Sequence, residues 1–458
     1  MAEVPCHLIQ NRLSSYCGVL YALQRQFKYG FINCCEIKDQ NVSHGNLFLL
    51  GKENVSKTYE IKEFLSRNLV EFLCFEVGHD LEAQPLIDKY KIQNSKYPII
   101  VFDDGHILED PDLFQVAHSI GLHSTPHDNY YDLVIVGMGP AGLASAIYAG
   151  SEGLRTLVIE KHSPGGRAGS TSMIENLIAH PDGITGAEFS ERSRKQAEKF
   201  GVEFVLPVVI TDIVKQDDCF SVSLSSGVSI SGRSVIIAVG VRYRLLQLPG
   251  VEKFLSSGIF YGSAMTEGKR NEGKEVFVVG GANSAGQAAM YFSRFAKKVH
   301  LVVRGESINK RMSQYLIEEI YNRPNIEVMT QSEITAINGD EKLESLRILN
   351  TLSKQTNTFS ADSLFLLIGG QPHVDPLGSR LLRDENGFIV TGPDIERHNR
   401  FSSEWTIKRS PLSLETNVPG IFAIGDVRSG TAKRMAAAVG DGANVINQVA
   451  KYFTFQKL

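Results

Sequence analysis

The sequence predicts an α/β protein in which strands and helices alternate along three successive segments. Two segments share a strand, a glycine-rich turn, a helix and a second strand, over residues 131–161 and 274–306. The third segment, residues 45–123, alternates strand and helix patterns and ends in a hairpin and a helix. At 458 residues the chain is long enough for roughly two to four domains, which agrees with this division.

Composition and charge exclude several classes of protein. The formal net charge is −4, so no basic surface for nucleic acid is expected. The sequence holds no run of about 18 apolar residues that could span a membrane. Its first segment, MAEVPCHLIQNRL, lacks the pattern of a secretory signal. We therefore expect a cytoplasmic protein that binds neither nucleic acid nor a membrane.

The cysteines are few and have no redox or metal-binding spacing. They are Cys6, Cys17, Cys34, Cys35, Cys74 and Cys219. No pair has the C-x-x-C spacing of a redox dithiol or a zinc site. We therefore expect reduced and mostly buried thiols.

Residues 1–44 have no motif and stay unassigned, but a regular order of elements follows them. The expected elements are a strand at 46–50, a helix at 58–68, a strand at 70–77, a helix at 82–92, a hairpin at 98–110 and a helix at 111–122. In the first helix Ile61, Phe64 and Leu65 share one apolar face. Asp103-Asp104-Gly105 supplies the turn of the hairpin.

This order of elements over residues 45–123 resembles the thioredoxin/glutaredoxin fold. Pro98 opens the third strand, where that fold carries a cis-proline. Its C-x-x-C would follow the first strand, and Val55 and Thr58 stand there instead. Residues 124–130 form a polar linker. The nearby histidines, His118, His123 and His127, match no metal pattern, so no metal site is expected.

The unit at 131–161 has the features of a dinucleotide-binding turn. Gly137 permits a tight turn, Gly139 lets the backbone approach a pyrophosphate, and Gly142 allows close packing of helix on strand. The pyrophosphate would lie at the helix N-terminus, where free N–H groups and the helix dipole favour an anion. Glu160 ends the second strand, where it can accept hydrogen bonds from ribose hydroxyls.

The unit at 274–306 predicts a second nucleotide site. Its turn runs from Gly280 to Ala285, and Ala282 stands where the middle glycine normally clears the pyrophosphate. Three cations follow the second strand, where a site for NAD would carry an acid: Arg304, Lys310 and Arg311. Cations suit a 2′-phosphate, so NADPH is favoured over NADH. An exposed basic loop without a ligand is the alternative interpretation.

Near the C-terminus the strand GIFAIG, residues 420–425, delivers Asp426 ahead of an alanine-rich helix. An acid at the end of a strand can hold a cofactor hydroxyl. Taken alone, an ordinary turn aspartate explains it equally well.

Five ordered motifs make residues 131–455 similar to the thioredoxin-reductase family of FAD- and NADPH-dependent oxidoreductases. They are GMGPAG (137–142) with Glu160, PGGRAG (164–169) with IEN (174–176), SVIIAVGVRYR (234–244), FAIGD (422–426) and KRMAAA (433–438). Val239 replaces the threonine of the family's A-T-G strand.

The resemblance implies the site residues. For FAD they are Gly137, Gly139, Pro140, Ala141, Gly142, Glu160, Gly165, Gly166, Arg167, Ala168, Asn176, Gly425, Asp426, Arg434, Met435 and Ala436. For NADPH they are Gly280, Gly281, Asn283, Ser284, Ala285, Arg304, Lys310 and Arg311. No side chain is assigned as a catalytic nucleophile.

The resemblance also implies the architecture. An FAD domain forms from residues 131–244 and 371–458, with an NADPH domain of residues 245–370 between its two parts. Both domains are of the three-layer, Rossmann-like type, and a homodimer is expected as in the family.

One family feature is missing from this sequence. Thioredoxin reductases carry Y-C-A-T-C before the NADPH turn, and its dithiol takes electrons from the flavin. Here Tyr261 is followed by Gly262, Ser263, Ala264 and Met265. A thioether cannot cycle as a disulfide.

The sequence therefore indicates a flavoprotein in which NADPH reduces FAD and the electrons leave without these dithiols. A quinone, a ferredoxin-like protein or a disulfide protein could accept them. A redox-sensing or scaffolding flavoprotein with little turnover is the alternative, favoured by the missing dithiols and by Ala282. A disulfide reductase that uses Cys219 or Cys74 is a third interpretation. It is disfavoured because neither cysteine has a partner nearby in sequence.

Overall fold

The computed structural model describes residues 47–52, 55–255, 257–262, 265–372, 374, 380–397, 405 and 407–456. The chain divides into two units, residues 1–43 and 44–458, and all described residues belong to the second. The unassigned extension, residues 1–44, lies outside the described residues. The same is true of four cysteines: Cys6, Cys17, Cys34 and Cys35.

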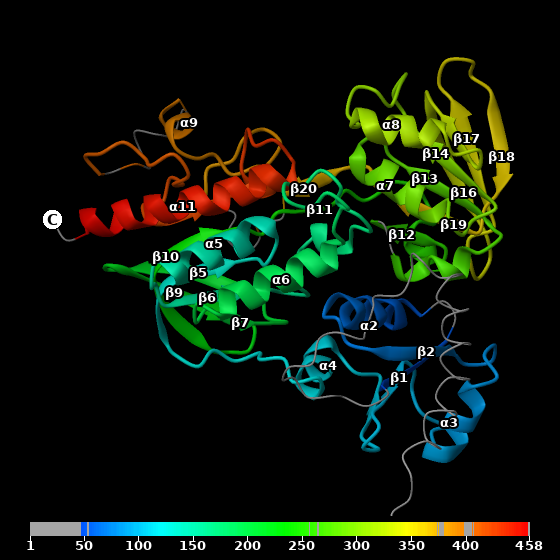
Figure 1. The fold of residues 1–458 in the computed structure, drawn as a ribbon, viewed down its shortest axis with the longest axis horizontal. Coiled ribbons are helices and arrows are strands. Elements are labelled where there is room, and N and C mark those ends of the chain that lie inside the picture. The colour runs from blue at the N-terminus through cyan, green and yellow to red at the C-terminus, as the bar shows by residue number, and fades with distance from the viewer. Residues whose placement is uncertain are drawn as a thin grey trace, which may run out of the picture. The chain divides into compact units, whose positions relative to one another are not determined.

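The N-terminal part of the described chain forms a four-stranded sheet with three helices (Figure 1). The strands are β1 (Leu47–Gly51), β2 (Phe72–Glu76), β3 (Ile99–Val101) and β4 (Ile107–Glu109). The helices are α2 (Ser56–Arg67), α3 (Ala83–Tyr90) and α4 (Leu113–Ser119). The strand order is β2-β1-β3-β4, with β1 and β2 parallel and the other pairs antiparallel. These are the elements, in the order, that the sequence predicts.

Local sequence explains how this part forms. The stripe of Ile61, Phe64 and Leu65 on α2 is buried, as the apolar period predicts. Helix α4 begins at a capping box, in which the Asp112 carboxylate accepts from the Gln115 N–H at 2.8 Å and the Gln115 side chain accepts from the Asp112 N–H at 2.9 Å. The peptide bond before Pro98 is cis, as expected.

A seven-stranded sheet carries the first glycine turn. Its strands are β5 (Tyr130–Val136), β6 (Thr156–Ile159), β7 (Glu203–Val205), β8 (Ile210–Gln216), β9 (Cys219–Leu224), β10 (Ser229–Ile237) and β21 (Ile421–Ala423). The order is β7-β6-β5-β10-β9-β8, and β21 also pairs with β10. Strands β5, β6, β7, β10 and β21 are parallel, while β8 and β9 join as an antiparallel meander.

Three helices accompany this sheet: α5 (Pro140–Ser151), α6 (Gly186–Glu198) and α11 (Met435–Phe455). Helix α11 packs closely on α5, because Gly442 has no side chain. A Cβ on Gly442 would lie 2.5 Å from the carbonyl oxygen of Ala141. Residues from the end of the chain therefore complete the sheet and the helix layer that residues 130–159 begin.

A five-stranded parallel sheet carries the second glycine turn. Its order is β12 (Ile259–Tyr261), β19 (Ser363–Leu366), β13 (Glu275–Val279), β14 (Lys298–Val302) and β15 (Ile326–Met329). Helices α7 (Asn283–Phe292) and α8 (Gln314–Tyr321) pack on it. An antiparallel sheet of β16 (Ser332–Asn338), β17 (Ser345–Asn350) and β18 (Thr356–Ser360) lies beside it, with the rings of Phe277 and Phe359 in contact.

Short elements connect these sheets. They are β11 (Val241–Tyr243), β20 (Gly370–Pro372), α9 (Pro393–Glu396) and the 3₁₀ helices η2 (Ala168–Ser170), η3 (Glu252–Phe254), η4 (Met265–Glu267), η5 (Lys269–Asn271) and η7 (Gly425–Val427). Strands β11 and β20 pair antiparallel where the chain enters and leaves the region of the five-stranded sheet.

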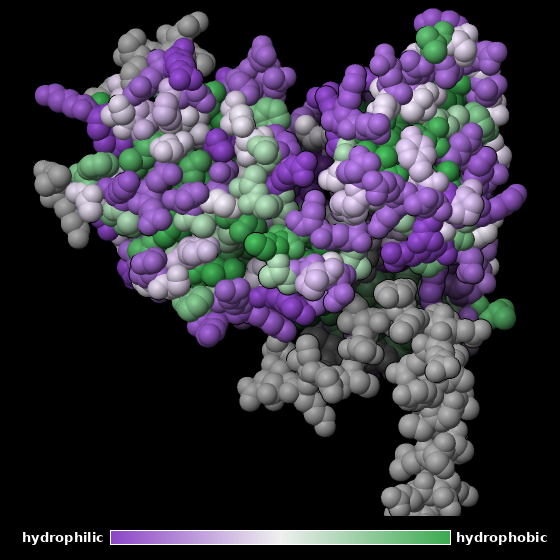
Figure 2. All heavy atoms as spheres, turned by 45° about the horizontal axis from the view of Figure 1, so that its top comes forward, coloured by the Kyte–Doolittle hydropathy of each residue, from purple (hydrophilic) through white to green (hydrophobic). Residues whose placement is uncertain are grey.

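The surface and the thiols complete the description. On the face drawn in Figure 2, hydrophilic and hydrophobic residues are interspersed. The expectation of mostly buried thiols is wrong for the two described cysteines, because Cys74 is exposed and Cys219 is half-exposed. Cys74 lies on β2, an edge strand, so one side of that strand has no neighbour to cover it. No helix within the described ranges is long and apolar enough to cross a membrane.

Candidate functional site

The first glycine turn has the geometry that a dinucleotide requires. Gly137 has φ +104°, and Gly139 is the N-cap of α5 with Pro140 as the first helical residue. A Cβ on Gly142 would lie 1.9 Å from the Gly137 carbonyl oxygen, so only glycine permits this packing. A Cβ on Gly139 would meet no atom within 4 Å. Open space therefore lies beside the Gly139 Cα at the start of α5.

Glu160 is buried at the end of β6 and holds this turn in place. Its Oε2 accepts from the Met138 N–H at 2.8 Å, and its Oε1 accepts from the His162 N–H at 2.9 Å. A carboxylate oxygen accepts more than one hydrogen bond. Glu160 therefore fixes the turn and keeps acceptor capacity for a ribose hydroxyl.

The loop 163–170 lies directly against the glycine turn. The Gly165 N–H donates to the Met138 carbonyl at 2.7 Å, and a Cβ on Gly166 would lie 3.3 Å from the Cα of Gly139. Both loop glycines have positive φ, +86° and +52°. The structure thus brings together two groups of predicted FAD-site residues, 137–142 and 165–168.

Arg167 provides a buried donor in this loop. Its guanidinium lies over the Tyr243 ring, 4.8 Å from the centroid. Its Nε is buried and has no hydrogen-bond partner among the described residues. A buried donor without a partner costs about 1–3 kcal/mol. Arg167 is therefore well suited to donate to an anionic or carbonyl group bound in front of the turn.

Asp426, in η7, lies near the same loop. Burial raises the pKa of its carboxyl, and the charges of Lys433 and Arg167 oppose that rise. The adjoining Gly425 N–H donates to Asp441 Oδ2 at 3.0 Å. Arg434 caps the start of α11 and is exposed, as is Ala436, while Met435 is half-buried. Asp426 and Arg167, distant in sequence, therefore face one site.

Asn176, also predicted for the FAD site, lies in the segment after the loop 163–170. It is exposed, and its amide makes no hydrogen bond to another described residue. Its segment is held at Ile174, which bridges to Ile184. Gln287 of α7 donates to the Met173 carbonyl at 3.1 Å. This contact brings the helix of the second glycine turn against the segment that contains Asn176.

The second glycine turn is closed in a different way. Gly280 has φ +150°, and a Cβ there would lie 2.5 Å from the Leu367 carbonyl oxygen. Ala282 is the N-cap of α7. The Asn283 side chain exchanges two hydrogen bonds with Ser313, at 2.9 and 2.7 Å. The Asn283 amide therefore ties α7 to α8, which leaves its backbone N–H for a ligand.

The other residues predicted around the second turn differ in exposure. Gly281 is half-buried and Ala285 is buried, whereas Ser284 is exposed in the first turn of α7. The three cations after β14 are also exposed, and none forms an ion pair with another described residue: Arg304, Lys310 and Arg311. They are therefore available to a phosphate group.

Position 262 has no room for a side chain. Gly262 follows β12 with φ +91°, and a Cβ there would lie 2.5 Å from the Tyr243 hydroxyl oxygen. The rings of Tyr243 and Tyr261 are stacked, 6.3 Å apart. Ser263 and Ala264 lie outside the described residues. The described cysteines, Cys74 and Cys219, are free thiols on different sheets.

Sequence reasoning missed two contacts that side chains of α2 make near this site. Arg67, at the end of α2, donates from Nη2 to the carbonyls of Ser163, Pro164 and Gly166 at 3.3, 3.2 and 2.6 Å. Lys62 of α2 binds Glu267, with Nζ 3.0 Å from Oε1. A position on the polar face of a helix predicts solvent exposure and gives no sign of such partners.

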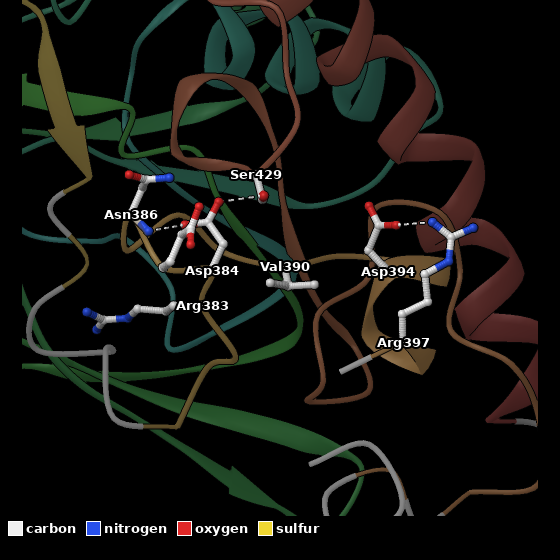
Figure 3. A pocket seen from close by; sticks show the side chains of 8 residues that line it. Arg383, Asp384, Asn386, Val390, Asp394, Arg397 and Ser429 are labelled. Carbon is white, nitrogen blue, oxygen red and sulfur yellow. Dashed lines mark hydrogen bonds and ion pairs between the residues drawn. The ribbon is translucent and has the colours of Figure 1, made fainter. Parts of the chain in front are cut away.

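An open pocket of about 430 Å³ lies apart from the predicted cofactor-site residues (Figure 3). Its lining residues are Arg383, Asp384, Glu385, Asn386, Val390, Asp394, Arg397 and Ser429. Its polar groups pair with one another. Ser429 donates to Asp384 at 2.6 Å, and Arg397 donates to Asp394 at 3.0 Å. None of the predicted site residues lines it, so it is not the predicted cofactor site.

Known proteins share this arrangement. Residues 131–442 match the family model of the pyridine nucleotide-disulphide oxidoreductases. Thioredoxin reductase of Peptoclostridium acidaminophilum is 31% identical over 331 residues, 71% of this chain and 98% of that protein. The solved T. acidophilum thioredoxin reductase is 26% identical with a TM-score of 0.63, over 71% of this chain and 99% of that one. The solved Lactococcus lactis thioredoxin reductase, in its FR conformation, is 29% identical with a TM-score of 0.62, over 70% of this chain and 98% of that one.

Proposed function

The chain belongs to the pyridine nucleotide-disulphide oxidoreductase family, and within its thioredoxin-reductase-like members we propose a specific role for it. It takes hydride from NADPH onto FAD and passes the electrons to an external acceptor without a dithiol of its own. The open space in front of Gly139 is the observation that carries this proposal.

The residues of the first turn fit FAD. The α5 N-terminus suits the pyrophosphate, Glu160 suits a ribose hydroxyl, and Asp426 suits a hydroxyl of the ribityl chain. The buried Arg167 Nε supplies a donor that the described residues leave unused. FAD, when bound, supplies the ability to accept a hydride and release its electrons. The chain's residues bind and orient it.

The residues of the second turn fit NADPH. The exposed Arg304, Lys310 and Arg311 suit its 2′-phosphate. The bond from Gln287 to the Met173 carbonyl supports an arrangement in which the two nucleotide sites face each other. The proposed domains are residues 131–244 with 371–458 for FAD and 245–370 for NADPH, and the family's homodimer is proposed with them.

The acceptor side lacks the family's dithiol. Position 262 holds a glycine whose space is limited by Tyr243, and Val55 and Thr58 replace a dithiol in the N-terminal domain. The sheet order and element order of residues 47–122 support a thioredoxin/glutaredoxin-like domain. A quinone, a ferredoxin-like protein or a disulfide protein is the proposed acceptor.

A redox-sensing flavoprotein with little turnover is the second candidate. Ala282 favours it, because this residue caps α7 where the pyrophosphate of NADPH would approach. Steady NADPH consumption with ferricyanide or a quinone distinguishes the two functions. The sensing function predicts flavin reduction without sustained consumption.

The decisive experiment is an anaerobic NADPH titration of the purified protein, followed through the flavin spectrum. We expect bleaching by NADPH and then turnover with ferricyanide. A folded protein that takes up no FAD on reconstitution would contradict the proposal.

A variant with all six cysteines replaced by Ser or Ala tests the route of the electrons. We expect it to bind FAD and retain ferricyanide reduction, because no step uses a thiol. Robust thioredoxin reduction by the unmodified protein, lost on replacing one particular cysteine, would show that a thiol relay exists elsewhere in the chain.

A further inference from the structure

We propose that the N-terminal domain, residues 47–122, covers a surface that a protein acceptor would otherwise use. Contacts made by α2 hold the domain in this position. The surface is formed by the loop 163–166, Phe260 and Glu267, and we call it the α2 surface. This inference rests on the proposed function, because it concerns which acceptors reach the reduced enzyme.

Arg67 makes the first contact. Its Nη2 donates to three backbone carbonyls of the loop beside the first glycine turn, those of Ser163, Pro164 and Gly166. A cationic donor shared by three carbonyls forms charge-assisted hydrogen bonds, which are stronger than neutral ones. The C-terminal end of α2 is therefore fixed to the loop that faces the predicted FAD site.

Lys62 makes the second contact, five residues earlier in α2. Its Nζ lies 3.0 Å from Oε1 of Glu267, whose residue is only 1% exposed. Arg270 lies 3.7 Å from the other carboxylate oxygen. Removing a partner from a buried carboxylate is costly, since the charge stays in a poorly solvated place. Glu267 therefore favours the docked position of α2.

Tyr59 makes the third contact, one further turn toward the start of α2. Its ring lies 5.3 Å from the ring of Phe260, which stacks on Phe365 at 5.1 Å. Residues 59, 62 and 67 thus contact the core from one helix, through an aromatic pair, an ion pair and hydrogen bonds. Such a mixture of contacts is typical of a specific interface.

The docked helix covers the place where a dithiol partner would approach. Helix α2 packs on η4, which begins at residue 265. Val55 immediately precedes α2 and Thr58 lies in its first turn. Thr58 and residue 265, one cysteine-lacking position from each side, therefore lie on elements in contact with each other.

Neither Val55 and Thr58 nor Gly262 and Met265 supply a thiol. Cys74 lies close enough to Lys62 and Glu267 for their charges to act on the pKa of its thiol, but it is a free, single thiol. The described residues of this contact therefore hold no dithiol for disulfide exchange. The role of the docked domain is steric. While α2 is docked, a free protein of similar fold cannot use the α2 surface, but a small acceptor does not need it. The kind of partner that fits this surface is a thioredoxin-fold domain, and the chain supplies its own.

The test compares Lys62→Glu with Lys89→Glu in the full-length protein. Lys62→Glu places a carboxylate beside Glu267 and Glu63 and should undock α2. Lys89 is exposed on α3, in the same domain, so its reversal changes the net charge equally and leaves α2 in place. Arg67→Ala is measured in parallel. It removes the hydrogen bonds to the loop 163–166, so an effect shared by both variants cannot come from residue 62 alone.

Three measurements follow: hydrogen exchange of peptides covering residues 163–170 and 259–261, proteolysis of the linker at 124–130, and NADPH-dependent reduction of ferricyanide and of cytochrome c. Lys62→Glu should increase exchange and linker cleavage and raise the ratio of cytochrome c to ferricyanide reduction. Lys89→Glu should match the unmodified protein.

Unchanged exchange and cleavage in both Lys62→Glu and Arg67→Ala would overturn the docking proposal. Faster exchange with an unchanged acceptor ratio would overturn its steric role. Absence of ferricyanide reduction in the unmodified protein would contradict the proposed function instead, and the exchange and cleavage data would still decide the docking.

Discussion

The hydroxyl of Tyr243 occupies the space that a side chain at Gly262 would enter, 2.5 Å from the position of its Cβ. Gly262 also has φ +91°, a conformation that other L-residues adopt at a cost. Sterics and backbone conformation both oppose a side chain here. The position that lacks the family's thiol is thus one where the surrounding structure disfavours any side chain.

We therefore expect Gly262→Ala to destabilise the protein more than Gly240→Ala. Gly240 also has positive φ, +63°, but a Cβ there would meet no atom within 4 Å. Gly240→Ala should cost about 1–2 kcal/mol for the left-handed conformation alone. Urea unfolding measures both variants. The excess at Gly262 should disappear when Tyr243→Ala is added, and an excess that persists would assign it to another neighbour.

The two glycines of the first turn should respond differently to a methyl group. Gly142→Ala places a Cβ 1.9 Å from the Gly137 carbonyl, so we expect a loss of about 3 kcal/mol or more, or failure to fold. Gly139→Ala meets open space in the protein, so it should cost the apoprotein only about 1 kcal/mol or less, for the poorer N-cap, while weakening FAD binding. Thermal unfolding without flavin and a flavin titration measure the two effects. Full FAD affinity in Gly139→Ala would place the pyrophosphate elsewhere.

Arg304→Ala should reduce the preference for NADPH over NADH. A charge-assisted bond to the 2′-phosphate is worth about 1.5–3 kcal/mol, which corresponds to roughly a 10- to 150-fold change in relative affinity. Arg304 is exposed, so stability should not change. Arg323→Ala, an exposed arginine beyond the other end of α8, is the control. Equal cofactor preference in both variants would mean that Arg304 does not meet the phosphate.

Asp426→Asn should separate stability from cofactor binding. Burial raises the pKa of Asp426 in the folded protein, so the folded state holds its proton to higher pH than the unfolded state does. The contribution of the Asp426 carboxyl to the free energy of unfolding therefore falls as the pH rises above the usual pKa of an aspartate. The Asn variant of the apoprotein should be at least as stable near neutral pH, with the difference shrinking in acid, while FAD binds more weakly. Lower apoprotein stability at neutral pH would contradict the prediction.

The sequence predicted most of the fold because its patterns are local. The stripe of Ile61, Phe64 and Leu65 predicted a buried helix face, and the roles of Gly137 and Gly142 follow from backbone geometry. The partners of Arg67 could not be predicted, since backbone carbonyls far along the chain carry no side-chain signature.

The dependence on partners from distant segments also explains where the structure differs from the sequence-based expectations. The exposure of Cys74 depends on which strand lies at the sheet edge, and that order is set by tertiary pairing. The bond between Asn283 and Ser313 joins two helix starts that the sequence separates. Roles that depend on partners from distant segments appear only in the folded structure.

The pairing of β21 with β10 and of α11 with α5 has a consequence for biosynthesis. The sheet around the first glycine turn needs residues 421–455, which leave the ribosome after the whole five-stranded sheet. The elements at 130–237 must wait, with part of their apolar surface uncovered, while the whole five-stranded sheet is synthesised and folds. Flavin capture is thereby tied to the synthesis of β21 and α11, and a chain that stops before β21 cannot form the Asp426 side of the site.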